Sequence, residues 1–527
     1  YNSEERRKKM ILFYNGKVFS SQGFQSALVV AGEYIIAVGG EELLPDYPEA
    51  EKINLEGRLV LPGFNDSHIH LLSYAKEKTY LALHQARRVE DIITMGRKYA
   101  QANHGLIIGV GYNEVNFTEP HELSRFDLDL ISPTVPVILY RICGHIACCN
   151  SIALHQAGIH SVFKVPDGVI DGDSFGHPTG MLREGALALL NPLIKNNSGN
   201  NIKGLLRAAI EDLHRFGITS IGSNDINDTD TQSVIRAYSE LYNAGELGVR
   251  VSQQATVASE KELIELSAVF PKANPYLRLG AVKVFVDGSL GAKTAYLKQN
   301  YCNENHRGLL TISEDKLRNI IDLASRYRLP TLIHAIGDAG VELALRVLGE
   351  NKESILLRSG IVHAQITDRK LLDDFSKKRV CALVQPAFIN TDVEFIENRI
   401  ALSLIETSYA FKTLYDNTIT AFGSDCPVES CNPLFGIYCA VNRSNHKKTK
   451  FLNSAEKMTV EEAVLAYTLG GAMITGEENI KGKIKKSYYA DITVLRDDIF
   501  SLPIDKLLDT QVVMTMVGGK IVYHNLV

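Results

Sequence analysis

The chain has 527 residues, of which 45% are hydrophobic, and its formal net charge at pH 7 is −5. This composition excludes a disordered chain, and 56 Lys and Arg against 61 Asp and Glu leave no basic stripe for a nucleic-acid partner. No apolar run reaches the roughly 18 residues that a membrane-spanning helix needs, so we expect no membrane partner.

Cysteine usage is typical of a reducing compartment. The chain has 8 cysteines, and none of them forms a Cys-x-x-Cys pair. A structural zinc knuckle is therefore not expected. We interpret the cysteines as reduced thiols and predict a cytoplasmic location. Residues 1–9, which contain a run of charged side chains, are left out of the fold prediction.

Both ends of the chain are rich in predicted strands. Segment 11–19 predicts two short strands around the hairpin signal Asn15-Gly16, and segment 27–38 repeats this pattern around Gly32. Near the other end, 490–495 predicts a strand and 512–523 a hairpin around Gly518-Gly519. We interpret segments 10–60 and 481–527 as one small β-sandwich-like domain formed by both termini, with a larger domain, 61–480, between them.

The middle of the chain alternates helices and strands, as βαβ units do. In segment 202–222, Leu206, Ile210 and Leu213 recur at helical spacing, and the strand 218–221 follows. Segment 313–335 has the same plan, with Ser313 as the expected helix cap and 331–335 as the strand. Thr367 is expected to open a further helix ahead of the strand 381–385.

The predicted buried strands indicate a closed (β/α)₈ barrel of the TIM type. They are 59–61 running into His68, 218–222, 249–255, 279–286, 331–335, 360–364, 381–385 and 418–423. Segment 75–200 is too long for one crossover, so we expect it to be a large insertion after the first barrel strand.

Ionisable side chains lie at the ends of several of these strands. His68 and His70 lie two residues apart, so they share one face of a strand and form a natural metal clamp. His334, His363 and Asp425 each end a later predicted strand, and Lys283 lies inside an apolar one. Active sites of barrels lie at this end of the strands, and a buried lysine needs a partner. Together these residues predict a metal site.

The motifs GFNDSHIH, LGAVKVFVDGS, LIHAIGD, VHAQ and GSDCP occur in this order. Taken together, they resemble the amidohydrolase superfamily, and more narrowly amidohydrolase family 3, the branch that is similar to N-substituted formamide deformylase. The insertion resembles that branch too, in FDLDLISPTVPVILYRICGHIACCNSIAL and DGDSFGHPTGMLREGA. The resemblance extends over nearly the whole chain.

The resemblance implies a role for each of these residues. It implies that His68, His70 and Asp425 bind one divalent metal ion and that His334 and His363 bind a second. Lys283 matches a lysine that CO₂ converts to a carbamate, which bridges both ions. Imidazole and carboxylate ligands suit zinc, although Fe, Mn or Co also fit.

The function that follows is metal-dependent hydrolysis of a non-peptide C–N bond, of the amide or formamide kind, in a small-molecule substrate. A metal-activated hydroxide would attack the substrate, and Asp425 would carry the proton to the leaving nitrogen. Weaker candidates are His145 and Tyr112 for substrate binding, and Asp287 and Asp338 for orienting the ligands from behind. A homo-oligomer is left open.

Two alternatives remain open at this point. One is a deaminase of the same fold, which would hold one metal ion. Such deaminases lack a lysine on the fourth barrel strand, where this chain has Lys283. Gly337 also stands where such deaminases tend to carry a glutamate. The other is a barrel retained as a non-catalytic binding or regulatory protein, whose expected mark is the loss of a ligand.

Overall fold

The computed structural model describes residues 10–103, 105–114, 117–119, 121–142, 146–165, 168–197, 201–227, 231–257, 259–270, 274–445 and 447–525. The chain divides into two compact units. One contains the segments up to Tyr74 and from Lys203 onward, and the other is Ala75–Ile202. Each unit is described by itself.

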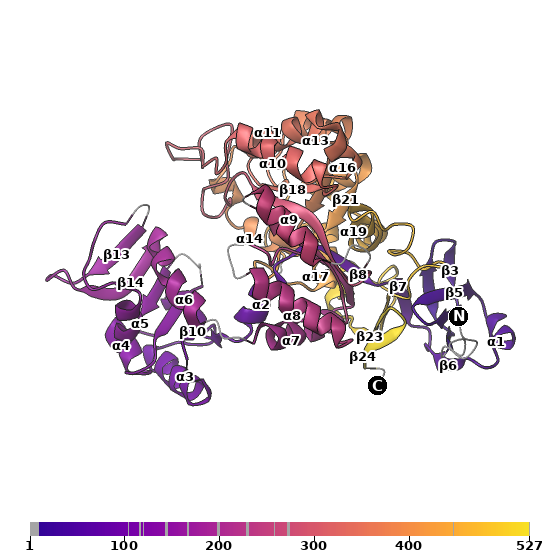
Figure 1. Cartoon of the computed structure of the whole chain (residues 1–527), viewed down its shortest axis with the longest axis horizontal. Helices are drawn as coiled ribbons and strands as arrows, with labels where there is room; N and C mark the ends of the chain where they lie inside the picture. Colours follow the sequence, from indigo (N-terminus) through magenta and orange to yellow (C-terminus); the bar gives the residue numbers. More distant parts are fainter. Residues whose placement is uncertain are drawn as a thin grey trace. The chain divides into compact units, whose positions relative to one another are not determined.

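The first unit contains an eight-stranded sheet that curves into a barrel (Figure 1). Its strands pair in chain order, and every pair is parallel. They are β8 (Phe64–Ile69), β15 (Ile218–Ser223), β16 (Arg250–Thr256), β17 (Leu277–Phe285), β18 (Thr331–Ala335), β19 (Gly360–His363), β20 (Cys381–Val384) and β21 (Thr420–Phe422). The prediction of a TIM-type barrel is therefore confirmed.

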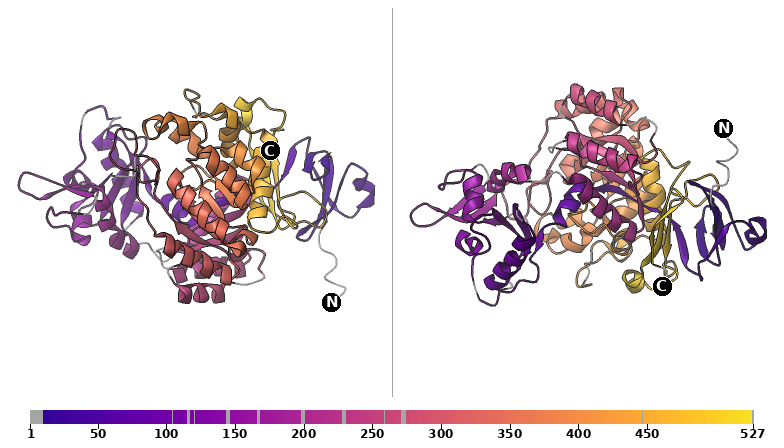
Figure 2. Two further views of the ribbon diagram at one scale, coloured as in Figure 1. Left: turned by 90° about the horizontal axis from the view of Figure 1, so that it is seen from above. Right: turned by 60° about the horizontal axis from the view of Figure 1, so that its bottom comes forward.

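Helices lie around the outside of this barrel (Figure 2). They include α7 (Ile202–Arg215), α8 (Thr231–Asn243), α9 (Glu260–Val269), α10 (Glu314–Arg326), α11 (Asp338–Glu350), α13 (Arg369–Lys378) and α16 (Phe411–Asn417). The hydroxyl of Ser313 accepts a hydrogen bond from Lys316 N and caps α10, as predicted. The cap of α13 is Asp368 rather than Thr367, because the Asp368 carboxylate accepts from Leu371 N at 2.8 Å.

The barrel closes between β8 and β21 through side-chain and loop hydrogen bonds. Asp66 accepts two bonds from Ser424, from its backbone N–H at 2.9 Å and its hydroxyl at 2.6 Å. Asp425 N donates to His68 O at 2.8 Å, and His70 N donates to Cys426 O at 2.9 Å. Burial raises the pKa of Asp66 to about 7. The seam therefore places the end of β8 directly beside the segment after β21.

Strands from the two ends of the chain form two further sheets in the first unit, outside the barrel. One has the order β24-β23-β22-β7-β2-β3 and the other β5-β4-β1-β6. Their bounds are β1 (Met10–Tyr14), β2 (Lys17–Ser20), β3 (Gly23–Gln25), β4 (Ala27–Ala31), β5 (Tyr34–Gly39), β6 (Glu51–Asn54), β7 (Leu59–Pro62), β22 (Ile492–Leu495), β23 (Val512–Val517) and β24 (Lys520–His524). Phe13, Val30, Val60 and Met514 share one buried core between them.

The Asn15-Gly16 turn does not form the expected hairpin. β1 pairs with β4 and β6, whereas β2 pairs with β3 and β7. Asn15 does adopt the left-handed backbone of a turn, with φ of +52°. The turn carries the chain from one sheet into the other, and Gly16 N donates to Ser26 O instead of across a hairpin. The hairpins around Gly32 and Gly518-Gly519 are antiparallel, as expected.

The segment expected to be the first barrel strand is two strands. β7 pairs with β22 and β2 in the terminal sheet, and only β8 pairs with β15 in the barrel. Gly63 separates them, donating to Asp491 O at 2.9 Å. A Cβ at Gly63 would lie 2.2 Å from the Thr219 hydroxyl oxygen. The change of sheet therefore brings the backbone too close to β15 for any side chain.

The second unit is built on a six-stranded sheet of order β13-β14-β12-β11-β10-β9. Its strands are β9 (Leu81–Ala82), β10 (Ile107–Tyr112), β11 (Val137–Arg141), β12 (Ile146–Cys149), β13 (Gly168–Gly172) and β14 (Pro178–Glu184). The helix α3 (Val89–Ala102) contributes Val89 and Ile92 to a core with Leu139 of β11. This unit is the insertion after the first barrel strand.

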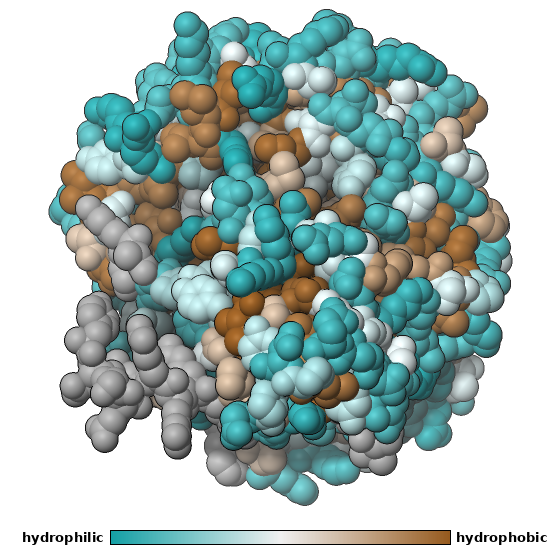
Figure 3. All heavy atoms as spheres, turned by 90° about the vertical axis from the view of Figure 1, so that its right-hand side faces the viewer, coloured by the Kyte–Doolittle hydropathy of each residue, from teal (hydrophilic) through white to brown (hydrophobic). Residues whose placement is uncertain are grey.

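The surface carries mixed side chains. Figure 3 shows one face of the molecule, on which hydrophilic residues predominate and hydrophobic ones form smaller patches between them. Within the described ranges, no helix combines the length and the apolar character needed to cross a membrane.

Gly63→Ala tests the close approach at the change of sheet. We expect the free energy of unfolding to fall by about 1–3 kcal/mol, because Thr219 and the backbone of β15 must move away from the new methyl group. Gly291→Ala is the matched control, since its Cβ would meet only Phe395, at an ordinary 3.7 Å. Urea titration followed by circular dichroism measures both, and equal midpoints for the two variants would contradict this packing.

Candidate metal centre

The carboxyl ends of the barrel strands bring the six predicted ligands together. His68 lies in β8 and His70 directly follows it, whereas Lys283 and His334 lie in β17 and β18. His363 is the last residue of β19, and Asp425 follows β21. In a parallel barrel these strand ends share one rim, so the barrel itself gathers side chains from distant parts of the chain.

Asp425 is the centre of one half of the cluster. Its Oδ1 lies 3.3 Å from His68 Nε2 and 3.2 Å from His70 Nε2. Lys283 Nζ lies 3.3 Å from the same His68 nitrogen. Lys283 and His68 are both buried, and His70 is partly exposed. Four candidate ligands therefore meet within direct contact distance.

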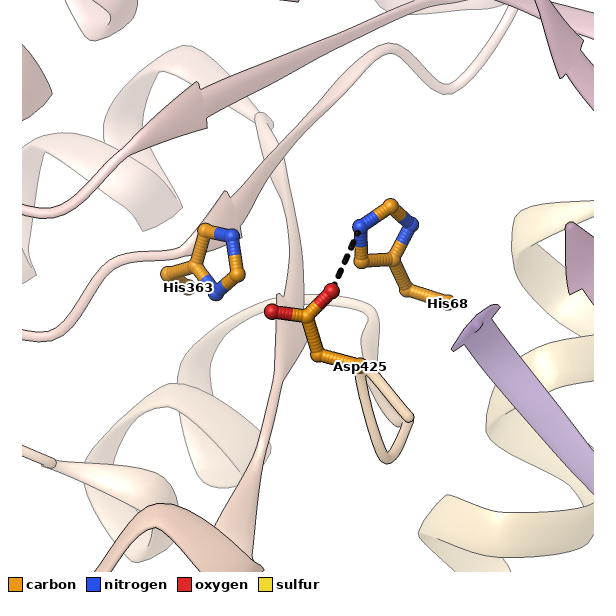
Figure 4. A group of neighbouring side chains, drawn as sticks. All are labelled: His68, His363 and Asp425. Carbon is orange, nitrogen blue, oxygen red and sulfur yellow. Dashed lines mark ion pairs between the residues drawn. The ribbon is translucent and has the colours of Figure 1, made fainter. Parts of the chain in front are cut away.

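His334 and His363 form the other half. Their rings lie 4.5 Å apart, and the ring of His363 lies 5.9 Å from that of His68. Figure 4 shows His68, His363 and Asp425 pointing toward one another. One ligand atom from each of these three residues lies within 4.8 Å of the other two. The two halves are thus continuous.

Backbone strain is concentrated at two of these residues. His363 has φ of +80° and Asp425 has φ of +57°. Neither residue is glycine, and such conformations cost of the order of 1–3 kcal/mol each unless the surroundings impose them. The chain accepts this cost at the points where it must turn a side chain into the cluster.

Each histidine has one ring nitrogen occupied by an acceptor outside the cluster. Nδ1 of His68 lies 2.6 Å from Gln254 Oε1, and Nδ1 of His363 lies 2.8 Å from Gln385 Oε1. Nδ1 of His70 lies 3.2 Å from Asn224 O. These three rings therefore keep Nε2 for the cluster.

His334 is turned the other way. Its Nε2 lies 3.1 Å from Gly288 O, so Nδ1 is the nitrogen that remains for a metal ion. Asp287 Oδ1 lies 3.5 Å from the same Nε2. Phe285 packs beside the ring at 5.2 Å and is 37% exposed. The ring is thus held between a carbonyl, a carboxylate and an aromatic side chain.

Burial disfavours the charged forms of His68, His334 and Lys283 and so lowers their pKa values. Desolvation, with a smaller contribution from Lys283, lowers the pKa of His68 to about 4 and that of His334 to about 3. Desolvation also lowers the pKa of Lys283 to about 7, against a weaker opposing effect of Asp425. A large fraction of the Lys283 amine is therefore uncharged near neutral pH.

The cluster fits a divalent cation. Asp425 Oδ1 is buried and accepts no hydrogen bond from the described residues. The nitrogens beside it belong to His68 and His70, whose ring protons point to Gln254 and to Asn224. The carboxylate oxygen thus faces the Nε2 lone pair of the neutral His68 ring, an arrangement that is unfavourable without a positive charge between them. Imidazole and carboxylate are the donors that zinc and related metals prefer.

The remaining predicted site residues are placed differently. Asp287 is buried and accepts hydrogen bonds from the backbone N–H of Tyr296, Ile336 and Gly337 at 2.8–3.0 Å, which ties the loop after β17 to the loop after β18. Asp338 opens α11 and accepts a hydrogen bond from Lys298 N at 2.9 Å. Tyr112 is buried at the end of β10 in the second unit. His145 lies outside the described residues.

Sequence reasoning missed Gln254 and Gln385. Gln254 lies in β16 and Gln385 directly follows β20, at the rim that carries the ligands. For Gln385 the signal was present, since it is the one polar residue at the end of the predicted strand 381–385. Gln254 did not stand out, because Arg250, Ser252 and Gln253 make the strand around it polar as well. Phe388, which stacks on His363 at 5.8 Å, carried no comparable signal.

Comparison with known proteins agrees with this geometry. The Bacillus subtilis protein YtcJ, which is named as an amidohydrolase, is 33% identical over 488 residues, covering 90% of this chain and 91% of the relative. The N-substituted formamide deformylase of Arthrobacter pascens is 24% identical over 525 residues, covering 94% and 95%. A solved structure of a metal-dependent hydrolase from Pyrococcus horikoshii superposes with a TM-score of 0.81 at 26% identity, covering 94% of this chain and 99% of that one.

The sequence pattern of the amidohydrolase family matches residues 51–523, which include the whole barrel and every candidate ligand. The resemblance inferred from the five strand-end motifs is therefore confirmed, and so is the prediction of an amidohydrolase enzyme. By sequence pattern, by fold and by the side chains gathered at the barrel rim, the chain belongs to the amidohydrolase family.

Proposed function

We propose that this protein hydrolyses a non-peptide C–N bond, of the amide or N-substituted formamide kind, with the help of divalent metal ions. The observation that carries the proposal is the buried Asp425 oxygen facing the imidazoles of His68 and His70, with Lys283 in contact with His68. The relative named N-substituted formamide deformylase supports the choice of bond.

The ligand assignment belongs to this proposal. His68, His70 and Asp425 would hold one ion, and His334 and His363 a second, with zinc the expected metal and Fe, Mn or Co able to replace it. When bound, such ions would polarise a substrate carbonyl and lower the pKa of water from 15.7 toward about 7.

Lys283 would join the two halves as a carbamate. The neutral amine attacks the carbon of CO₂, and a nitrogen–carbon bond forms while one C=O π pair moves onto oxygen. One amine proton then leaves to solvent. The product is an anion with two oxygens, which replaces a buried amine that lies 3.3 Å from His68 Nε2 and 5.2 Å from the centre of the Phe285 ring. An ammonium beside divalent cations would be repelled, whereas this anion would be attracted.

Asp425 is the proposed proton carrier. Its carboxylate would take the proton of the attacking water and return it to the leaving nitrogen, so that an amine departs instead of an amide anion. Asp287 would hold His334 in position from behind the ring. Roles for Asp338, Tyr112 and His145, a homo-oligomeric state and a cytoplasmic location stay predictions.

The assay for this function uses a panel of small N-substituted amides and formamides together with a measurement of metal content. We expect hydrolysis that disappears when a chelator removes the metal and returns when Zn²⁺ is restored. A protein with stoichiometric metal that hydrolyses no amide would contradict the proposal. Ammonia release from aminopyrimidines with one metal ion bound would favour a deaminase instead.

Lys283→Met tests the bridging role with a side chain of similar length that cannot form a carbamate. We expect the loss of at least one metal ion and a decrease in kcat/KM of about 10³-fold or more, because the bridging anion is absent. Metal analysis and circular dichroism check the result, and the fold should be kept. Lys298→Met is the control, since Lys298 makes surface ion pairs with Asp368 and Glu342. Full metal content in Lys283→Met would contradict the bridge.

A further inference from the structure

Two glutamines lie behind two of the ligand histidines. Gln254 Oε1 lies 2.6 Å from His68 Nδ1, and Gln385 Oε1 lies 2.8 Å from His363 Nδ1. All four side chains are buried. The glutamines come from different strands and serve one histidine in each half of the cluster.

The orientation of each amide is fixed by the backbone. Gln254 Nε2 donates to Ser67 O at 2.8 Å, and Gln385 Nε2 donates to Leu383 O at 3.1 Å. Because a carbonyl accepts only, the NH₂ group must face it, and the amide oxygen must face the imidazole. The ring nitrogen Nδ1 is therefore the one that carries the proton.

The barrel makes room for one of these contacts. A Cβ at Gly222 would lie 2.4 Å from Ser67 O and 2.5 Å from Gln254 Nε2. Gly222 lies in β15 and has no left-handed backbone that would by itself require glycine. Its lack of a side chain is what lets Gln254 reach Ser67.

We propose that Gln254 and Gln385 are positioning residues that hold His68 and His363 in the tautomer whose Nε2 lone pair faces the metal ions. This inference rests on the metal centre proposed above. With the Nδ1 proton donated to an amide oxygen, each ring loses both its rotation and the choice of tautomer before a metal arrives. The loss of conformational entropy of these two side chains thus occurs during folding and does not reduce the affinity for the metal ion.

The neutral acceptor also limits the charge of the centre. Histidine ligands of metals commonly donate to a carboxylate, a carbonyl or water, and a carboxylate makes the imidazole more basic. His68 already faces Asp425 and Lys283, the proposed carbamate. A glutamine fixes the ring without adding a further buried negative charge.

Gln254→Met and Gln385→Met test the inference, because methionine is of similar size and has no oxygen acceptor. Apo-protein is titrated with Zn²⁺ against a chromophoric chelator. We expect the dissociation constant to rise about 10–100-fold in each variant. Gln254→Met should weaken the binding of the ion that His68 holds. Gln385→Met should weaken the binding of the ion that His363 holds. Gly222→Ala should act like Gln254→Met, since it displaces the same amide.

Gln253→Met is the matched control. Gln253 precedes Gln254 on β16 and is equally buried, and its side chain forms no hydrogen bond with a ligand histidine among the described residues. The Gln253→Met variant should bind Zn²⁺ with the same dissociation constant as the unaltered protein. Proton NMR of the Co²⁺-loaded protein provides a second measurement, because an imidazole N–H that is held in a hydrogen bond exchanges slowly with water. In Gln254→Met, the N–H proton of His68 should exchange faster than in the unaltered protein.

The outcomes separate the two proposals. Zn²⁺ affinity unchanged in both glutamine variants, or weakened equally in Gln253→Met, overturns the positioning role while the metal centre stands. An unaltered protein that binds no Zn²⁺ overturns the metal centre, and the positioning role with it. Selective weakening with loss of the protected N–H resonance supports both.

Discussion

The seam between β8 and β21 is the constraint on which the site depends. His68 and His70 lie at the end of β8, on one side of this seam, and Asp425 lies just after β21, on the other. They meet because Asp66 binds Ser424 through two hydrogen bonds and Asp425 N donates to His68 O. Gly423 allows the two segments to approach this closely, since a Cβ there would lie 2.6 Å from His68 N.

The same seam accounts for the electrostatics of the cluster. It brings a carboxylate into contact with His68, whose pKa burial lowers to about 4. Lys283 reaches the same ring from β17, with an amine whose pKa burial lowers to about 7. Few side-chain protons point into the centre, because each of the four rings has one nitrogen beside an acceptor outside the cluster. A preorganised set of lone pairs of this kind favours cation binding and costs little reorganisation.

Much of this could be predicted from the sequence because each element carries its own signal. Strand-end residues such as His334 and His363 stand out against apolar neighbours, and the parallel barrel converts a strand-end position into a place on one rim. The helix that Ser313 caps was likewise predictable from local chemistry.

Other features could not be predicted, since they depend on contacts between distant segments. Pro62-Gly63 interrupts the run between β7 and β8, but the sequence does not show that β7 pairs with β22 in another sheet. Asn15-Gly16 specifies a turn but not the partners of the strands around it. The contact of Gln254 with His68 joins residues 186 positions apart, and the rotamer that forms it is set by Ser67 and Gly222.

The most direct measurement is a high-resolution crystal structure of the metal-loaded protein, with anomalous data collected on both sides of the metal absorption edge. We expect two anomalous peaks, one in contact with His68, His70 and Asp425 and the other with His334 and His363. We also expect density that continues beyond Lys283 Nζ as a carbamate touching both. An unmodified Lys283 amine beside two fully occupied metal sites would contradict this expectation.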